Sequence, residues 1–467
     1  MEIWQIISAI YLIIGIVLFF VVLARPKFFW PFLIAITVGT AGLIMIPKSP
    51  YCVALVDEFL LACVVLGAIV AVFFGAVKIV NPPLPLVAKI HQLLFFALAL
   101  YVLAQSLRGL MLWQDPLLIR WAVFYLLIIA IAFFVSNTNL PVPSAKKFLK
   151  IILLSALIYL AAYLSHGLFT QYILGISPFS LDVQGVWWAG ASYALFPLFV
   201  AIPAALIYLR HCCRGSRQWL GWSVIALGIL AAYFYDSRAA LIVIAAFAPF
   251  FFFTLGWRKN LAALALLFGS LAIYHWHDMA VFLASILQSV TFSYSGDFGR
   301  WTIVIAAIMA ISQSAGTFLF GYGIHSHHYV LGEFMKKAGH PTITSAVDYS
   351  QTTLPGGALV YDYTGQVPDY VRVTGFGGLL TDIGFIGILL LGAVFAITLI
   401  RIISLKKATV KLLAALPLIL ALPMMFFVKM EDIVLLWLMI MPSGILLSMA
   451  KIGSAGELHQ KNEKLWN

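Results

Sequence analysis

The sequence predicts an all-α, polytopic membrane protein. Of its 467 residues, 63% are hydrophobic and 10% are charged, and the mean hydropathy is +1.05. Long apolar runs at this density are typical of chains that cross a bilayer many times. We expect a single integral membrane domain over residues 1–467, with about 12–14 transmembrane helices.

Hydropathy predicts about thirteen spans, because each needs about 20 apolar residues. The first run is too long for the apolar region of a signal peptide and lacks a small-residue cleavage site, so we expect a retained helix. In chain order the expected spans are 3–24, 28–47, 57–80, 92–113, 117–135, 150–170, 189–209, 218–235, 239–257, 261–277, 374–400, 410–428 and 433–450.

Clusters of Lys and Arg orient these helices, because cytoplasmic loops carry an excess of basic residues. In the count of thirteen, the basic groups all fall on one side; they lie at 146–150, 210–217, 258–259, 401–411 and 451. We expect that side to be cytoplasmic, with the C-terminus inside and the N-terminus outside. If one early run does not span, the total is twelve and the N-terminus is inside.

Residues 278–373 form the expected outer-face segment. Within it, residues 301–320 are apolar enough to span, but a span there would place the next basic loop outside. We therefore expect an interfacial or re-entrant helix that ends at Gly321 and Gly323. The loop 321–372 then lies on the outer side as one large loop containing short helices, and its length is typical of a functional loop.

Charge and cysteine content limit the partners. The net charge of +11 fits anionic lipid head groups or an anionic substrate, whereas nucleic acid is excluded because no soluble basic domain is present. The four cysteines show neither zinc spacing nor a disulfide pattern. We expect no metal and no cofactor.

Three arginines lie at predicted helix starts on the outer side, where the basic-residue bias disfavours them: Arg238, Arg300 and Arg372. If they converge, they form an anion clamp, because a guanidinium presents two donors that match a diphosphate. The alternative for Arg238 is that its side chain reaches the lipid head groups.

Three histidines follow the Gly-x-Gly turn and are candidates for a base that titrates near neutral pH: His325, His327 and His328. We expect His327 or His328 to face the arginine clamp. A surface cluster or an adventitious metal site is the alternative. The pattern His-Ser-His-His lacks the i, i+4 pair of a helical zinc site.

Three motifs occur in order over about residues 219–400: "DSRAALIVIAAF", "FGRWTIVIAAIMAISQSAGTFLFGYGIHSH" and "GFGGLLTDIGFIGILLLGAVF". The first is similar to a Ser-Arg-Gly/Ala helix start, and the second to an arginine-bearing amphipathic helix with a glycine turn. The third is similar to a helix that carries a Gly-x-x-Gly pair, here Gly384 and Gly387. Together they resemble the O-antigen polymerase and O-antigen ligase superfamily.

The resemblance implies a metal-independent glycosyltransferase of the bacterial inner membrane, with its active site facing the periplasm. Its activity would be the polymerisation of undecaprenyl-diphosphate-linked oligosaccharide repeat units into an O-antigen, capsule or exopolysaccharide. The implied partners are the lipid-linked donor and acceptor, membrane lipids and a chain-length regulator. Arg238 and Arg300 match the diphosphate-binding arginines, Arg372 is a further candidate, and a loop histidine would assist the attacking hydroxyl.

Two other functions stay open. A ligase would transfer finished polymer to a lipid A core, but ligases carry a His-Asn pair eleven residues before the first glycine of the pair, where this chain has Val373-Thr374. That departure favours a polymerase and leaves the base open, with Arg372 plus Asp348 or Asp369, or no base, as rivals. A transporter is less favoured, because it predicts charges along a mid-membrane path and internal repeats.

Overall fold

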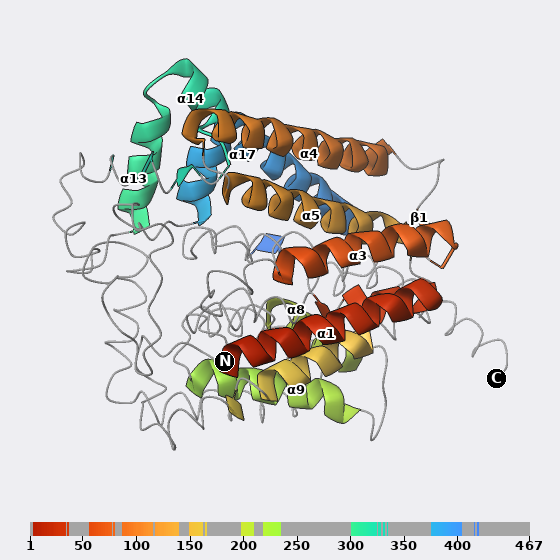
Figure 1. The fold of residues 1–467 in the computed structure, drawn as a ribbon. Coiled ribbons are helices and arrows are strands. Elements are labelled where there is room, and N and C mark those ends of the chain that lie inside the picture. Colours follow the sequence, from red (N-terminus) through yellow and green to blue (C-terminus); the bar gives the residue numbers. More distant parts are fainter. Residues whose placement is uncertain are drawn as a thin grey trace, which may run out of the picture.

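The computed structural model describes residues 3–33, 35–36, 56–76, 78–79, 86–114, 117–139, 149–161, 164–165, 198–209, 218–234, 300–324, 326–327, 330–331, 334, 375–403, 415 and 418–419. Within these residues the backbone is almost entirely helical (Figure 1). The expected spans 239–257, 261–277 and 433–450 lie outside the described residues, as does nearly all of 410–428.

The described helices lie where hydropathy placed apolar runs. The N-terminal half contains α1 (Ile3–Ala24), η1 (Pro26–Phe28), α3 (Val56–Phe73), α4 (Leu86–Trp113), α5 (Leu117–Asn137), α8 (Leu198–Ile207) and α9 (Trp219–Phe234). The C-terminal half contains α13 (Arg300–Ile311), α14 (Ala315–Phe320) and α17 (Gly375–Ile403). Two two-residue strands, β1 (Lys78–Ile79) and β2 (Thr138–Asn139), pair antiparallel just beyond the ends of α3 and α5.

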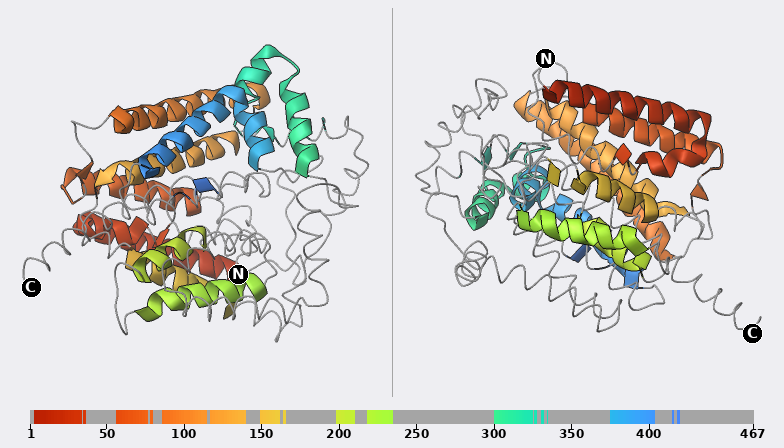
Figure 2. Two further views of the ribbon diagram at one scale, coloured as in Figure 1. Left: turned by 180° about the vertical axis from the view of Figure 1, so that it is seen from behind. Right: turned by 90° about the horizontal axis from the view of Figure 1, so that it is seen from below.

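The helices stack side by side, as Figures 1 and 2 show: α3 packs against α1 and α5, and α4 packs against α5 and α17. Large aromatic side chains fill the contacts. The rings of Phe29 and Phe134 meet edge to face with centroids 5.1 Å apart, and Phe95 and Phe124 are also fully buried. Edge-to-face packing of this kind adds to the gain from burying the rings themselves.

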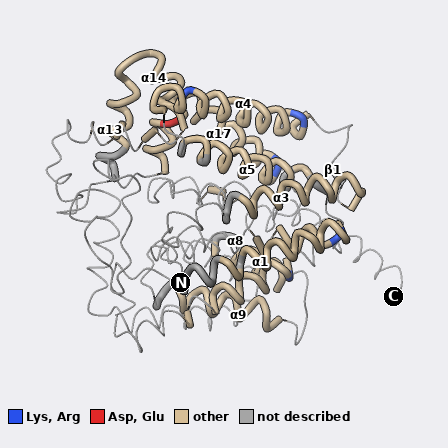
Figure 3. The backbone as a smooth tube through the Cα atoms, in the orientation of Figure 1, with Lys and Arg blue, Asp and Glu red and all other residues tan. Residues whose placement is uncertain are grey.

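Two of the described helices, α4 and α17, are long and apolar enough to cross a membrane. Charged positions are sparse along the described helices, which Figure 3 shows as long uncharged stretches. A rise of about 1.5 Å per residue gives α4 a length of about 42 Å, more than the roughly 30 Å hydrocarbon core of a bilayer.

The surface of α4 is the reverse of a water-soluble helix. Apart from Lys89 near its start, its large exposed side chains are apolar and recur every three or four residues through much of the helix: Leu86, Leu93, Phe96, Leu100, Leu103, Leu107 and Met111. Its polar residues His91, Gln105 and Ser106 are instead buried. An amphipathic helix in water places these two classes the other way round.

The segment expected to form one interfacial helix over 301–320 is two helices. α13 ends at Ile311, and Ser314 caps the start of α14 by accepting from the Thr317 N–H at 3.0 Å. The Thr317 side chain in turn accepts from the Ser314 N–H at 3.1 Å, which completes a capping box. At about 18 Å and 9 Å, neither helix is long enough to cross a bilayer core.

Helix α17 is broken at one residue. Gly384 has φ 60° and ψ −168°, which is non-helical, so residues 375–383 and 385–403 form two helical segments. Glycine adopts this conformation without the steric cost that a side chain would bring. The break lies at the end of α4 where α13 and α14 also lie (Figures 1 and 2).

Candidate functional site

The break in α17 frees three consecutive carbonyl groups, and each accepts a hydrogen bond from outside the helix. The Thr381 carbonyl accepts from the Tyr322 N–H at 2.8 Å, and the Asp382 carbonyl accepts from the Gly323 N–H at 3.0 Å. The Ile383 carbonyl accepts from the Tyr101 hydroxyl of α4 at 2.6 Å. Orphaned backbone carbonyls in an apolar setting need such partners, so the break joins three segments into one junction.

Glycines allow these backbones to approach. A Cβ on Gly321 would lie 2.6 Å from the backbone at Thr381, Asp382 and Gly384, and Gly321 itself has φ 69°. Gly323, with φ 105°, lies directly against Gly109 of α4. The Ile324 N–H then donates to the Gln105 carbonyl at 3.3 Å. The Gly-x-Gly turn therefore positions the segment that contains His327 between α4 and α17.

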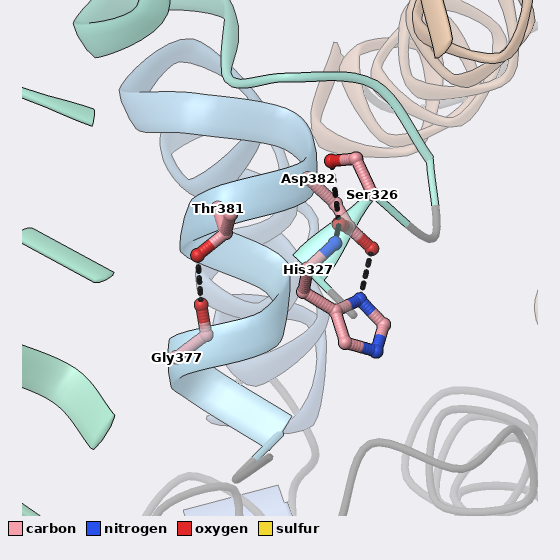
Figure 4. Close-up of polar contacts among 5 residues, drawn as sticks. All are labelled: Ser326, His327, Gly377, Thr381 and Asp382. Carbon is pink, nitrogen blue, oxygen red and sulfur yellow. Dashed lines mark hydrogen bonds and ion pairs between the residues drawn. The ribbon is translucent and has the colours of Figure 1, made fainter. Parts of the chain in front are cut away.

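Asp382 and His327 form the centre of the junction (Figure 4). The His327 imidazole contacts Asp382 through Nδ1 at 2.8 Å from Oδ2, and the His327 N–H donates to Oδ1 at 2.8 Å. The Ser326 hydroxyl donates to the same Oδ1 at 3.1 Å. Asp382 is fully buried and His327 is 3% exposed. One carboxylate thus fixes both the backbone and the ring of the histidine.

This contact sets the chemistry of the imidazole. An ionised carboxylate only accepts hydrogen bonds, so Nδ1 carries the proton that it shares with Asp382. In the neutral ring, the lone pair is then on Nε2, on the side turned away from Asp382. A histidine held in this tautomer by a carboxylate can accept a proton at Nε2, and the carboxylate stabilises the imidazolium that forms.

A new helical turn begins at His327. The Val330 N–H donates to the Ser326 carbonyl at 3.1 Å, and the Asp382 carboxylate therefore lies at the start of this turn, where negative charge is favourable. The turn rests on a small apolar cluster in which Leu331 and Phe334 pack with Ala307 and Ala310 of α13 and Leu380 of α17. The Tyr322 hydroxyl also donates to the Ala310 carbonyl at 2.9 Å.

A second polar cluster lies at the other end of the α4–α17 pair. Arg401 approaches His91 Nδ1 at 2.8 Å, and His91 Nε2 lies 2.9 Å from the Thr398 hydroxyl. Because a guanidinium only donates, Nδ1 must accept and Nε2–H must donate. The Thr398 hydroxyl donates to the Val394 carbonyl at 2.7 Å. His91 is fully buried, so both of its nitrogens are used to hold α4 against α17.

The expected site residues fall into two groups. His327 is the one whose side chain the structure describes, and it lies at the junction. The outer-face residues Arg238, Arg372, His325 and His328 lie outside the described residues, and so do the rival carboxylates Asp348 and Asp369. Arg300 begins α13, but its side chain is not among those described. The expected approach of a histidine to an arginine clamp stays a prediction.

No family model matches the chain, and no curated protein or solved structure is significantly similar to it. The resemblance carried by the three motifs is therefore still an expectation. Support for a function comes from the geometry of the junction.

Sequence reasoning missed Asp382, the partner of His327. A signal was available, because a carboxylate inside an apolar run is rare and such residues usually mark a functional site. Tyr101 and Gln105 were also missed, and they give a weaker signal, since polar side chains of this size occur in many apolar helices. Among the residues that the structure describes, no three metal-binding side chains come together.

Proposed function

We propose that the protein is a membrane glycosyltransferase that polymerises undecaprenyl-diphosphate-linked repeat units at the periplasmic face, with His327 as its general base. The observation that supports this proposal is the buried His327–Asp382 pair, held at a helix break by three segments. A pre-oriented acid–base pair inside an otherwise apolar framework is typical of an active site.

The proposed reaction is a single displacement. The acceptor hydroxyl oxygen attacks the anomeric carbon of the donor sugar, and the bond from that carbon to the diphosphate oxygen breaks. His327 Nε2 takes the hydroxyl proton, and the electron pair of the broken bond leaves with the lipid diphosphate. Asp382 holds the ring and balances the imidazolium charge. General base catalysis of this kind contributes about 100- to 10,000-fold.

The membrane part of the proposal rests on α4 and α17. Both are long and apolar enough to cross a bilayer, and α4 exposes apolar residues while it buries polar ones. A lipid-facing helix has this arrangement, because contact with lipid tails costs an apolar side chain nothing. We propose a multi-pass protein of the inner membrane, with the junction on the periplasmic side.

Complementation of a deletion strain tests the proposal and separates the three candidate functions. We expect the deletion to leave single repeat units on the lipid A core, and His327→Gln or Asp382→Asn to reproduce that phenotype with wild-type protein levels. A ligase predicts no glycan on the core at all, and a transporter predicts lipid-linked units that do not reach the periplasmic face. Normal polymer from both variants would falsify the assigned base.

The transporter remains a second candidate because of one observation. His91, Arg401 and Thr398 form a buried polar cluster between two membrane-length helices, and intramembrane ionisable groups often mark an ion or substrate path. The deletion phenotype above distinguishes this candidate. The hydrogen bonds of His91 instead favour a structural role, since neither nitrogen has a lone pair available to accept a proton.

A further inference from the structure

The last three turns of α4 carry a polar stripe, formed by Tyr101, Gln105 and Arg108. These residues recur at intervals of four and three, so they lie on one face of the helix, next to Gly109 at the junction. The Tyr101 hydroxyl donates a hydrogen bond to the Ile383 carbonyl at the break in α17. The Gln105 side chain contacts the Tyr101 hydroxyl, which leaves its Oε1 atom and the guanidinium of Arg108 without an assigned role at the junction.

The Gln105 side chain is buried without a full set of partners. It is 4% exposed, and its Oε1 has no hydrogen-bond donor among the residues that the structure describes. Leaving a buried carbonyl oxygen without a hydrogen-bond donor is unfavourable, because its hydration is lost and not replaced. A bound hydroxyl or amide donor would remove that cost.

Arg108 is a half-buried cation beside an aromatic surface. Its guanidinium carbon lies 6.0 Å from the ring centroid of Phe320 in α14. No carboxylate in the described part of the chain forms an ion pair with it, and Asp382 at the same junction is paired with His327. A partly desolvated cation without a counter-ion favours binding of an anion.

The surface beside Arg108 is apolar and exposed. Phe318 of α14 and Phe385 of α17 stack with centroids 5.5 Å apart and an interplanar angle of 19°, and both are 42% exposed. Phe320 and Leu389 are also exposed, so the apolar surface continues from α14 down α17. An anion with a hydrocarbon chain matches this arrangement, because a cation lies next to a surface that gains from contact with the chain.

We propose that Arg108 binds the phosphate of a lipid phosphate whose hydrocarbon chain lies across Phe318, Phe320 and Phe385, and that Gln105 accepts a hydrogen bond from a hydroxyl of the attached group. The lipid phosphate is the lipid-diphosphate-linked glycan donor of the reaction, and this identification rests on the proposed function. The N-terminal half of the chain then contributes substrate-binding residues to a site whose base comes from the C-terminal half.

Binding of farnesyl diphosphate to the full-length protein in phosphatidylcholine nanodiscs tests the role of Arg108. We expect Arg108→Gln to raise the Kd at least about tenfold, which corresponds to about 1.4 kcal/mol. Arg108→Lys should fall between that variant and the wild type, because a point charge lacks the two-pronged donor geometry. Lys89→Gln is the matched control, since Lys89 is an exposed cation at the other end of the same helix.

Three further binding measurements identify the chemical class of the ligand. Farnesol should bind at least about tenfold more weakly than farnesyl diphosphate, and inorganic diphosphate should also bind more weakly, because each lacks one half of the ligand. Competition by phosphatidylglycerol in the nanodisc would identify a membrane head group as the occupant instead of the donor. Gln105→Leu should leave farnesyl diphosphate binding unchanged and weaken binding of the glycan-bearing lipid extracted from the deletion strain.

The outcomes separate this inference from the proposed function. His327→Gln should retain farnesyl diphosphate binding while it loses polymer. If Arg108→Gln loses binding but His327→Gln makes normal polymer, the lipid phosphate site stands and the assigned base fails. Equal affinity of wild type, Arg108→Gln and Arg108→Lys, with equal thermal midpoints, overturns the site. If Arg108→Gln does not fold, the Arg108→Lys variant tests the site instead. Wild-type affinity of Arg108→Lys for farnesyl diphosphate would contradict binding of the phosphate by two guanidinium donors.

Discussion

Asp382 accepts hydrogen bonds from the Ser326 hydroxyl and from both the N–H and the imidazole of His327. The two bonds to His327 constrain one residue at its backbone and at its side chain. Rotation of the ring away from the carboxylate would therefore strand a buried carboxylate oxygen, which is costly in an apolar setting. The fold itself therefore fixes the orientation of Nε2, as the proposed role of a general base requires.

Tyr101 stabilises the helix break next to the His327–Asp382 pair, and removal of its hydroxyl group tests that role. Tyr101→Phe leaves the Ile383 carbonyl without its donor, so we expect a loss of about 1–3 kcal/mol in stability together with lower polymer output. Tyr322→Phe is the comparison, because it also removes one hydroxyl donor to a carbonyl, that of Ala310 in α13. It should lower the thermal midpoint in detergent and retain polymer output. Equal loss of polymer in both variants would argue against a positioning role for Tyr101.

At this scale the sequence indicated His327 as a candidate base but did not indicate the carboxylate beside it. His327 follows a recognisable glycine turn, and imidazole is the side chain expected of a base near neutral pH. Asp382 lies inside a run that hydropathy scores as membrane-spanning, and its pairing with a residue 55 positions earlier depends on tertiary packing. Which of the three clustered histidines meets a carboxylate likewise depends on the path of the backbone after Gly323.

Among the elements, the two helices α13 and α14 and the broken helix α17 depart most from the expectation of unbroken helices. Hydropathy averages over a window, so the short polar stretch from Ser312 to Ser314 and its capping box with Thr317 are masked by the long apolar runs on either side. The break at Gly384 is invisible for the same reason. Glycine is common in apolar helices, and here the tertiary contacts with Gly321 decide that the helix opens.

A glycine series tests the junction as an element. Gly321→Ala should lower the thermal midpoint and abolish polymer, because its Cβ would meet backbone atoms at 2.6 Å and its φ is positive. The φ penalty alone is about 1–2 kcal/mol, and overpacking adds about 1–3 kcal/mol. Gly75→Ala isolates the first term, since Gly75 has φ 66° and a Cβ there meets nothing within 4 Å.

Gly392→Ala in the lower segment of α17 completes the series. Its Cβ also meets nothing within 4 Å, so the substitution should be neutral or slightly stabilising in a helix interior. The expected order of thermal midpoints is Gly392→Ala highest, Gly75→Ala intermediate and Gly321→Ala lowest. A Gly321→Ala protein as stable as Gly75→Ala would mean that the backbones at the junction can separate at little cost.

Across the whole molecule, the α4–α17 pair has polar groups at both ends and apolar surface between them. From the break to Arg401, the helical segment of α17 is about 24 Å long at a rise of about 1.5 Å per residue, which is comparable to the thickness of a hydrocarbon core. The pair thus fits a bilayer with the junction at one boundary and the His91–Arg401 cluster at the other. The basic residues that follow Arg401 in the sequence predict that this second boundary lies on the cytoplasmic side.

Labelling with an impermeant maleimide tests this orientation. In a background without the four native cysteines, a cysteine at the exposed Gln313 should react in cells whose outer membrane alone is permeabilised. A cysteine at Lys89 should react only after the inner membrane is lysed, because Lys89 lies at the other end of α4. The reverse pattern would place the junction in the cytoplasm and remove the basis for a periplasmic reaction. A cysteine near Gly356 tests the expected outer loop in the same way.

The carbonyl groups at the helix break already accept hydrogen bonds from the protein. This affects the competition between glycosyl transfer and hydrolysis in the proposed reaction. Helix breaks at membrane depth commonly recruit solvent to their exposed carbonyl groups. Here the carbonyls of Thr381, Asp382 and Ile383 each accept a hydrogen bond from a protein donor. The break therefore adds little attraction for water beside His327, although the same base would activate water as readily as a sugar hydroxyl. In the proposed reaction, this arrangement would keep the helix break beside His327 poorly hydrated and would favour the sugar hydroxyl over water as the nucleophile.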